Sequence, residues 1–542
     1  MHSLILSLFV SVILATNNSR DELPIGLTED ERSRIHEIYT MGRDTDPPPA
    51  PIRNVAEYER MEGVLIRYPF GISTVLIAEM SEDITIYCLV SSSQQNSASN
   101  SMENGDVNMD NVEFVLGNTD SYWTRDYGPW WVVDGQQNMS IVDFTYNRPR
   151  PNDNQAPLKM SNHLGVPYFA TDLVHAGGNY MTDGLGISAS SDLVFEENDI
   201  SNDSVLQVMQ DYYGIDSYHV ITDPNNSYID HIDCWAKYLS PTRVLIREVP
   251  ASQPQYDEIE ETADYFANTV NEWGEPWEVN RVWTPNDQPY TNSLILNEKV
   301  LVPVTGSNWD DEALAVYQEV MPGYEVLGFT GSWESTDALH CRIKGIPDLD
   351  MLQIFHNPVN DTTGPGEYGY EMEIIVDDLS EAGLIEDSIR IFWKTPETGT
   401  WLAAPMYDLD IPEEPDTRIG WIPAMADTGT IQYYFQAADS SGRVEKHPLA
   451  GYHEFMALPT NVCLQWAVGD LDNSGSIEII DVLLLADQVI SGIPAGICPG
   501  SVADINQDEA IDAMDIVLSL IHISEPTRRY AIADGGVGVE KK

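Results

Sequence analysis

The sequence predicts an α/β domain, followed by a β-sandwich and a small helical module. Between about residues 52 and 347, β-rich runs such as 64–68 and 299–304 alternate with helical runs such as 204–213 and 256–273. Such alternation by itself favours a parallel sheet. Between 348 and 458, short alternating runs such as 370–376 are separated by turn residues, which predicts an immunoglobulin-like sandwich.

The first 16 residues resemble a secretory signal peptide. Residues 4–15 form an apolar run too short to span a bilayer, and polar residues follow at once. The residues before this run include His2 but neither Lys nor Arg, which departs from the usual signal-peptide pattern. No later apolar stretch is long enough for a membrane helix, so we expect a secreted or cell-surface protein without a transmembrane segment.

Residues 17–51 predict a pro-segment or linker. A charged helical stretch from Glu29 to Tyr39 is followed by a proline-rich run at 46–51. These residues precede the predicted α/β domain, which we expect to begin at about residue 52.

The charge of the chain limits its partners. It has 87 acidic and 27 basic residues, which gives a formal net charge of -60. This excess argues against nucleic acid and anionic membranes as partners. It fits a solvated acidic surface and, secondarily, attraction of cationic ligands.

The five cysteines are too few for a disulfide scaffold. Cys463 and Cys498 flank one repeat near the C-terminus, and export would allow them to pair. Cys88 lies in an apolar strand-like run and is predicted to be a buried, inert thiol. Cys234 is interpreted as a packing residue.

Four residues in short motifs point to chemistry on a guanidinium group. A guanidinium is a planar cation with five donors and no acceptor, so its recognition needs carboxylates that accept in pairs. Asp126 and Asp233 are of that type. Cys341 has the type required of a nucleophile and His231 that of an acid for the departing ammonia.

These motifs resemble a known family, the secreted bacterial peptidylarginine deiminases, which are relatives of the agmatine deiminases. The resemblance extends over residues 57–69 (EYERMEGVLIRYP), 177–184 (GGNYMTDG), 231–237 (HIDCWAK) and 339–345 (LHCRIKG). It implies the pentein fold for residues 52–347, a five-bladed α/β propeller with its site on the pseudo-symmetry axis. It implies no redox cofactor and no catalytic metal.

The resemblance also implies a role for each of the four residues. Cys341 attacks the guanidinium carbon and forms a covalent thiouronium intermediate, with an ordinary buried thiol as the alternative. His231 protonates the leaving nitrogen and then activates water, whereas Asp126 and Asp233 each bridge two guanidinium nitrogens. Two nearby carboxylates disfavour a thiolate, so we expect the bound cation to help Cys341 ionise.

The resemblance places substrate selection in residues 147–151 (NRPRP), where Arg148 and Arg150 bind the α-carboxylate of a C-terminal arginine. A proline-stiffened surface loop is the alternative. Trp123 is expected to stack on the aliphatic stem of the substrate or to belong to the core. Asp183 either orients His231 or stabilises a loop, and His340 is interpreted as structural. Other pocket positions that match the family are Tyr228, Ile229 and Thr336.

Residues 463–522 contain two near repeats that resemble dockerin-type calcium loops. Oxygen ligands occur at positions 1, 3, 5 and 12 of each loop. The second loop has Glu509 where a turn glycine is expected, and acidic loops without metal are the alternative. A cohesin-like or cell-surface partner would fit this module. Residues 523–542 change composition abruptly and resemble a non-native tail. The predicted calcium ligands are Asp470, Asp472, Ser474, Asp481, Asp504, Asn506, Asp508 and Asp515.

The leading hypothesis is an exported peptidylarginine deiminase that converts arginine of peptides, preferably C-terminal, to citrulline and ammonia. Deimination of free arginine, or of agmatine for putrescine biosynthesis, is the nearest alternative, although agmatine has no carboxylate for Arg148 and Arg150. A cysteine protease would share Cys and His but lacks a use for the carboxylate pair. An inactive, calcium-dependent surface or scaffold protein is the alternative outside the enzymes.

Overall fold

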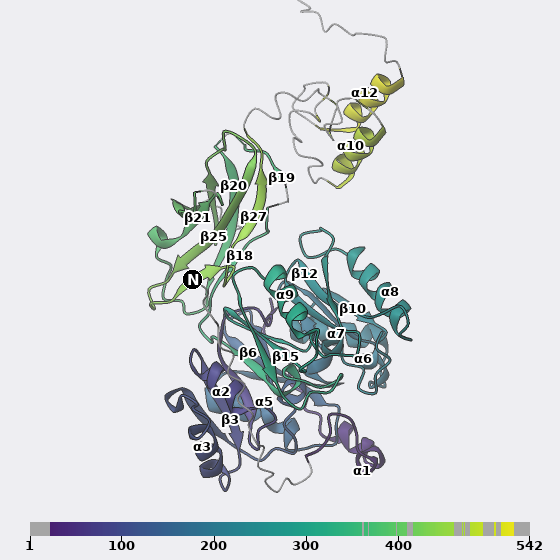
Figure 1. The fold of residues 1–542 in the computed structure, drawn as a ribbon, viewed down its shortest axis with the longest axis vertical. Helices are drawn as coiled ribbons and strands as arrows, with labels where there is room; N and C mark the ends of the chain where they lie inside the picture. Colours follow the sequence, from purple (N-terminus) through teal and green to yellow (C-terminus); the bar gives the residue numbers. More distant parts are fainter. Residues whose placement is uncertain are drawn as a thin grey trace, which may run out of the picture. The chain divides into compact units, whose positions relative to one another are not determined.

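The computed structural model describes residues 22–359, 362–366, 368–396, 398–408 and 416–459, and parts of 469–524 (Figure 1). The chain divides into two compact units. The first comprises residues 1–321 and 325–349, and the second comprises 322–324 and 350–542. The predicted signal peptide, Cys463, Cys498 and the tail from residue 525 lie outside the described residues. No helix in the described part is long and apolar enough to cross a membrane.

Within its described residues, the first unit contains five separate sheets of three or four strands. All five are mixed, which differs from the parallel sheet that alternation alone favours. The repeating element is an antiparallel pair whose second strand gains a parallel neighbour through a helix. For example, β14 (Leu294–Leu296) pairs antiparallel with β15 (Lys299–Val304), and β16 (Glu325–Thr330) follows α9 (Asp310–Val320) and pairs parallel with β15. A tight turn can join only antiparallel strands. Each hairpin therefore adds an antiparallel pair to a sheet that also contains a parallel pair.

The other four sheets repeat this arrangement. In spatial order they are β1 (Arg53–Asn54), β5 (Trp130–Val133), β6 (Met139–Tyr146) and β7 (Tyr168–His175); β10 (Ser217–Ile221), β9 (Ile187–Ser191) and β8 (Met181–Thr182); β11 (Ala236–Ser240), β12 (Arg243–Glu248) and β13 (Glu278–Trp283); and β17 (Lys344–Pro347), β2 (Met61–Arg67), β3 (Thr85–Val90) and β4 (Val112–Leu116).

Helices make the connections to the parallel strands. They are α2 (Thr74–Ser81), α3 (Gln95–Glu103), α5 (Ala156–Leu164), α6 (Leu193–Glu196), α7 (Asn202–Tyr213) and α8 (Tyr256–Ala267). Some of them, such as α3 and α8, lie toward the edge of the first unit in Figure 1. Single turns complete the unit: α1 (Glu29–Ser33), η1 (Ile35–Thr40), η2 (Met109–Asn111), α4 (Thr124–Tyr127), η3 (Asp153–Gln155), η4 (Gly177–Asn179), η5 (Ile232–Cys234) and η6 (His340–Arg342).

Local sequence explains the ends of these helices. The Ser201 side chain caps α7 by accepting from the Ser204 amide, and Gly214 ends it with a left-handed φ of 66°. The helix predicted over residues 256–273 is wrong at its end, because α8 stops at Ala267. The backbone and side-chain nitrogens of Asn268 donate to the Asp264 carbonyl and so terminate it.

The first and last strands of the unit lie in the same sheet. β17 pairs antiparallel with β2, with Lys344 opposite Leu65. The core beneath this sheet includes buried Leu76, Ile86 and Leu339. This pairing brings the segment that contains Cys341 back to the beginning of the unit. The arrangement of the five sheets as propeller blades around an axis stays a prediction.

The second unit begins with two β-sheets that share one core. Residues from both sheets, including Met372 and Phe435, are buried together. The immunoglobulin-like topology stays a prediction. One sheet has the order β18 (Leu352–Phe355), β20 (Tyr370–Asp378), β24 (Thr417–Ile422) and β23 (Tyr407–Asp408); the other contains β19 (Thr362–Thr363), β27 (His453–Ala457), β25 (Gly429–Ala438), β21 (Arg390–Lys394) and β22 (Leu402–Pro405), and β26 (Val444–His447) pairs with β25.

The C-terminal module contains α10 (Ile479–Ser491) and α12 (Ala513–Ser524), packed over a small apolar core. Asp481 and Asp515 are buried, and their Oδ1 atoms accept from the Leu471 and Ile505 amides at 2.6 and 2.8 Å. The same contact in both repeats fits their sequence similarity. The remaining predicted calcium ligands, Asp470, Asp472, Ser474, Asp504, Asn506 and Asp508, lie outside the described residues. The described residues contain no acidic, His or Cys cluster suited to a metal, so calcium binding stays a prediction.

Candidate active site

The predicted catalytic residues lie on or beside single helical turns, each just before a strand that forms an antiparallel pair in its sheet. Asp126 lies on α4, which precedes β5. His231 caps η5 and Asp233 lies within it, immediately before β11. Cys341 lies on η6, which precedes β17. These turns contact one another through η4, which precedes β8.

Gly178, on η4, lies against three of these side chains. A Cβ atom at this position would be 2.7 Å from Asp126 Oδ1, 2.7 Å from His231 Nδ1 and 3.2 Å from Asp233 Oδ2. The Gly178 amide donates to Asp126 Oδ1 at 3.2 Å. The glycine therefore allows two carboxylates and an imidazole to approach the same backbone. It is part of the GGN sequence that supports the family resemblance.

Asn292, just before β14, orients the predicted nucleophile. Its Nδ2 donates to Cys341 Sγ at 3.2 Å, and its Oδ1 accepts from the Ala338 and His340 amides at 3.2 and 3.1 Å. With Gly178 and Asn292, all five sheets contribute a residue to the site from the segment that precedes a strand of an antiparallel pair. Sequence reasoning missed Asn292, since no charge or motif distinguishes it from other asparagines.

The site is closed in this structure. Cys341, His231 and Asp126 are each 0% exposed. His231 Nδ1 lies 3.6 Å from Asp126 Oδ1, and neither ring nitrogen has a hydrogen-bond partner among the described residues. The same is true of Asp126 Oδ2. Buried polar atoms without partners are costly, so these atoms suit a ligand that is rich in donors.

The two carboxylates differ in their electrostatics. Burial, and then the negative charge of Asp233, raise the pKa of Asp126 to about 8. Burial also opposes ionisation of Asp233, but its hydrogen bond with His340 and the nearby positive charges keep its pKa below the ordinary value. Asp233 is thus ionised at neutral pH, whereas Asp126 is largely protonated before a cation binds.

His340 is a bridge between two carboxylates, which goes beyond the passive structural role expected from the sequence. Its Nδ1 lies 2.7 Å from Asp233 Oδ2 and its Nε2 lies 2.6 Å from Glu57 Oε2. A neutral imidazole has only one N–H, so this pair of contacts requires one additional shared proton. Glu57 is also paired with Arg125 and Lys237, each at 2.8 Å. The role of Glu57 could not be seen in the sequence, although it begins the first family motif.

Burial and neighbouring charges hold the nucleophile and the histidine in their neutral forms. Burial, followed by the charges of Asp233, Asp337 and Asp126, raises the pKa of the Cys341 thiol well above its ordinary value. Burial lowers the pKa of His231 to about 4. The sequence-based expectation that carboxylates disfavour the thiolate agrees in direction, but burial is the larger cause. The other thiols in the first unit, Cys88 and Cys234, are buried as expected.

The residues predicted to bind substrate gather around one chain segment, residues 22–33. Trp123 Nε1 donates to the Leu23 carbonyl at 3.0 Å, and Arg148 Nε donates to the Ile25 carbonyl at 2.9 Å. Arg150 forms an ion pair with Glu31 at 2.8 Å. The remaining predicted residues are adjacent: the Tyr228 ring lies against Gly26, Ile229 is buried, and Thr336 shares a side-chain hydrogen bond with Tyr228.

Asp183 does not contact His231. Its Oδ1 accepts from the Leu185 and Ile187 amides, each at 2.8 Å, and Tyr58 donates to its carbonyl at 2.6 Å. These contacts fix the turn between β8 and β9. They correspond to the loop role that the sequence left open and correct the alternative that Asp183 orients His231.

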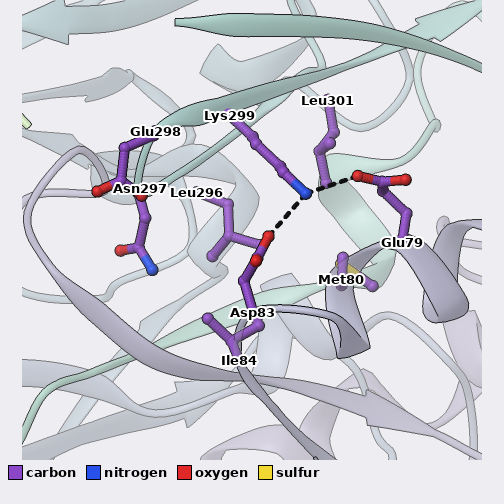
Figure 2. Close-up of a pocket in the computed structure, with 9 residues that line it drawn as sticks. All are labelled: Glu79, Met80, Asp83, Ile84, Leu296, Asn297, Glu298, Lys299 and Leu301. Atoms are coloured by element: carbon purple, nitrogen blue, oxygen red, sulfur yellow. Dashed lines mark hydrogen bonds and ion pairs between the residues drawn. The ribbon is translucent and has the colours of Figure 1, made fainter. Parts of the chain in front are cut away.

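Two further pockets lie in the first unit, and neither is lined by Arg148, Arg150 or Cys341. One is lined by Glu57, Asp233 and His340 together with β2 and β11 residues, on the Glu57 side of the bridge. Figure 2 shows the other, where Lys299 Nζ lies 2.6 Å from both Glu79 Oε1 and Asp83 Oδ2. It contains none of the predicted site residues, and its central cation is already paired. We interpret this second pocket as structural.

Residues 71–346, just over half of the chain, match the profile of the Porphyromonas-type peptidyl-arginine deiminase family. The match includes all four predicted catalytic residues, Gly178 and Asn292. The chain belongs to this family. Membership makes the protein a hydrolase that acts on the C–N bonds of amidines.

Relatives of this family member include agmatine deiminases by name. The chain is 24% identical over 261 residues to a protein named "Putative agmatine deiminase" from Mycoplasma capricolum. The aligned region covers 40% of this chain and 71% of the relative. A protein of the same name from Yersinia pestis is 23% identical, with 40% and 72% covered. The X-ray structure of a "putative agmatine deiminase" has a TM-score of 0.51 at 19% identity and covers 57% of this chain and 100% of that one. This likeness supports the deiminase fold.

Proposed function

We propose that the protein is an exported peptidylarginine deiminase that acts on peptides with a C-terminal arginine. The observation that best supports this is that a site suited to a guanidinium group lies close to arginines suited to a carboxylate. Asp126, Asp233, His231 and Cys341 form a site suited to a guanidinium group. Arg148 is near enough to Asp126 and His231 to influence both pKa values.

Arg150 gives direct support for carboxylate binding. Its Nε and Nη2 atoms approach the two oxygens of Glu31 at 2.8 and 3.3 Å, as an arginine fork does with a carboxylate. Both side chains are buried. A peptide with a free C-terminal carboxylate would present the same group to Arg150. Agmatine has no such group.

The proposed reaction begins with a change of protonation. The Cys341 proton moves to His231, so that the thiol and neutral imidazole become a thiolate and an imidazolium. The substrate guanidinium favours this change because its positive charge offsets Asp233 and Asp126, and its donors to Asp126 Oδ2 displace the Asp126 proton to solvent. The two carboxylates hold the guanidinium plane in one orientation.

The thiolate then adds to the guanidinium carbon. The imidazolium of His231 protonates one terminal nitrogen, the C–N bond breaks, and ammonia leaves a thiouronium intermediate. Neutral His231 takes a proton from water, which attacks the same carbon and expels the Cys341 thiolate. As the urea carbonyl forms, the adduct hydroxyl loses its remaining proton to solvent, so the net products are citrulline and ammonium.

Agmatine deimination is the second candidate, favoured by the names of the relatives. The same four catalytic residues would serve it. The buried Arg148 and Arg150 would then have only a structural role, in which they hold residues 22–33 in place. Export rests on the apolar run at residues 4–15, and retention at a surface through calcium-dependent repeats rests on the ligand pattern.

The test compares formation of the ureido product by mass spectrometry, and of ammonia, from a peptide ending in arginine, its C-terminally amidated twin, free arginine and agmatine, with Cys341→Ala as control; the product is citrulline from the arginine substrates and N-carbamoylputrescine from agmatine. Activity that requires the free carboxylate of the peptide supports the proposal. Activity mainly on agmatine places the enzyme in the polyamine branch. If no ureido product that depends on Cys341 forms from any of these substrates, either before or after residues 22–33 are cut away from the site, the deiminase role is overturned.

A further inference from the structure

One chain segment contacts nearly all of the residues proposed to bind substrate. Residues 22–33, here called the N-terminal segment, form a stretch with bends at Ile25 and Gly26, followed by α1. Carbonyls of the stretch accept from Trp123, Arg148 and Arg150, the last at 2.7 Å from Pro24 and 3.1 Å from Gly26. The contacts converge from positions far apart in the sequence.

Glu31 occupies the arginine fork itself. Arg150 is 1% and Glu31 2% exposed, so their ion pair is almost fully removed from water. The capping box of α1 fixes the orientation of Glu31: Thr28 N donates to Glu31 Oε2 at 2.8 Å, and Glu31 N donates to Thr28 Oγ1 at 3.2 Å. A second carboxylate cannot take the same two donors while Glu31 is in place.

The stretch before α1 covers the space beside the fork. Ile25 and Gly26 are buried, and a Cβ at Gly26 would be 2.6 Å from the Tyr228 ring. Arg67 anchors the beginning of the stretch through an ion pair with Glu22 at 3.0 Å. Cys341 has no exposed surface in this arrangement. Among the described residues, the segment is joined to the site by hydrogen bonds, ion pairs and packing and not by a side-chain cross-link.

We propose that the N-terminal segment is an autoinhibitory plug. Glu31 takes the place of the substrate α-carboxylate on Arg150, the stretch from Leu23 to Gly26 covers the approach to Cys341, and activity requires the segment to leave. This inference rests on the proposed function, because it identifies Arg148 and Arg150 as the carboxylate subsite.

The chain after the segment is attached independently, so release of the plug need not disturb the fold. Arg43 pairs with Asp143 at 3.0 Å. The Thr45 amide donates to the Ala170 carbonyl at 3.0 Å and the Ala170 amide to Thr45 Oγ1 at 3.0 Å. Cutting the chain between α1 and this attachment would free the plug together with the part of η1 before the cut, whose contacts include the buried Ile38 and the Tyr39 hydroxyl, which donates to the Glu197 carbonyl at 3.1 Å. Tyr39, in η1, is 58% exposed and offers an accessible position.

The experiment uses the full chain with three changes compared. Glu31→Gln removes the charge that pairs with Arg150 and keeps the side-chain shape. Glu29→Gln is the matched control, because Glu29 is an exposed residue of the same helix and does not contact Arg150. A specific protease site inserted after Tyr39 allows the plug to be cut after folding, which avoids any folding defect of the point variant.

Two readouts need no catalysis. The first is the rate at which iodoacetamide alkylates Cys341, followed by mass spectrometry. The second is the affinity of a peptide ending in arginine and of its amidated twin for Cys341→Ala protein, measured by calorimetry. We expect cleavage to increase the alkylation rate at least about tenfold, and Glu31→Gln to tighten only the free-carboxylate peptide at least about tenfold. Glu29→Gln should change neither value.

Unchanged alkylation and peptide affinity in both the cleaved chain and Glu31→Gln would overturn the proposal and make the segment a permanent wall of the site. Increased alkylation with equal affinity for both peptides would overturn the role of Glu31 as a carboxylate substitute. The proposed function is judged separately by the ureido products that the cleaved chain forms from the arginine substrates and from agmatine. If that chain deiminates only agmatine, the proposed substrate is wrong even where the plug is real.

Discussion

At the scale of single residues, Gly178 is the point where the guanidinium site is most tightly packed. Both proposed guanidinium-binding carboxylates and the proposed acid lie within 3.2 Å of the position that a Cβ would take. Any larger residue must displace at least one of them. The positions of these three side chains therefore depend on the absence of a side chain at residue 178.

We expect Gly178→Ala to reduce kcat/KM by about 100-fold or more, because displacement of about 1 Å at reacting groups has effects of this size. Gly366→Ala is a suitable control, since a Cβ there would meet only the Gly369 carbonyl at 3.6 Å. Citrulline release and thermal melting would be measured for both. Full activity of Gly178→Ala with normal melting would show that this close packing has no catalytic importance.

The protonation of Cys341 gives a second prediction at this scale. Its pKa is raised by burial and by Asp233, Asp337 and Asp126, so the thiol stays protonated at neutral pH and ionises only at clearly alkaline pH. Asp126, with a pKa of about 8, is already ionised when the thiol titrates. Asp126→Asn should therefore lower the pKa of Cys341.

Thiolate absorbance as a function of pH, with the Cys341→Ala signal subtracted, measures this directly. A bound amidine compound should lower the same pKa in the unaltered protein. If neither the substitution nor the cation moves the titration, the nearby carboxylates do not control the nucleophile.

Residue types in the sequence could predict which groups take part in the chemistry but not which groups orient them. Cys341, His231, Asp126 and Asp233 belong to motifs whose chemistry is readable, and the fold brings them together. Asn292 and Glu57 act through contacts with residues 49 and 283 positions away. No local pattern records such a partner, because the pairing exists only after the sheets form.

At the scale of elements, the site depends on turns at one repeated position. Each contributing residue lies within a few positions of a strand that forms an antiparallel pair in its sheet, from α4 before β5 to η6 before β17. Hydrophobic periodicity located strands such as β15 and helices such as α7, because these have regular patterns. The functional turns are only three or four residues long and have no period.

The cap of α1 gives a prediction at the element scale. Thr28→Ala removes the acceptor for the Glu31 amide, and loss of such a cap costs about 1 kcal/mol. We expect this change to loosen Glu31 and to speed alkylation of Cys341 by about threefold to fivefold. Ser33→Ala, at the other end of the same helix, is the control. Equal alkylation rates in the two variants would show that the helix cap does not control access to Cys341.

At the scale of the whole molecule, the excess of carboxylates determines how stability depends on pH. Burial raises the pKa of Asp143 and of Asp153 to about 7, whereas an unfolded aspartate titrates near 4. Between these values the folded state binds more protons than the unfolded state. Linkage then requires stability to be greatest at the acidic end of this range and to fall as pH rises through about 7.

Repulsion among exposed charges acts in the same direction, since the formal net charge reaches -60 at pH 7. We expect the Tm of the first unit to fall by on the order of 5 °C between pH 5.5 and pH 8. Added salt screens exposed charges but not buried carboxyl groups, so 0.5 M NaCl should recover only part of the loss. Calorimetry at both pH values, with and without salt, separates the two causes. Complete recovery would assign the loss to surface repulsion alone, and a Tm that rises with pH would contradict the burial of protonated carboxyl groups.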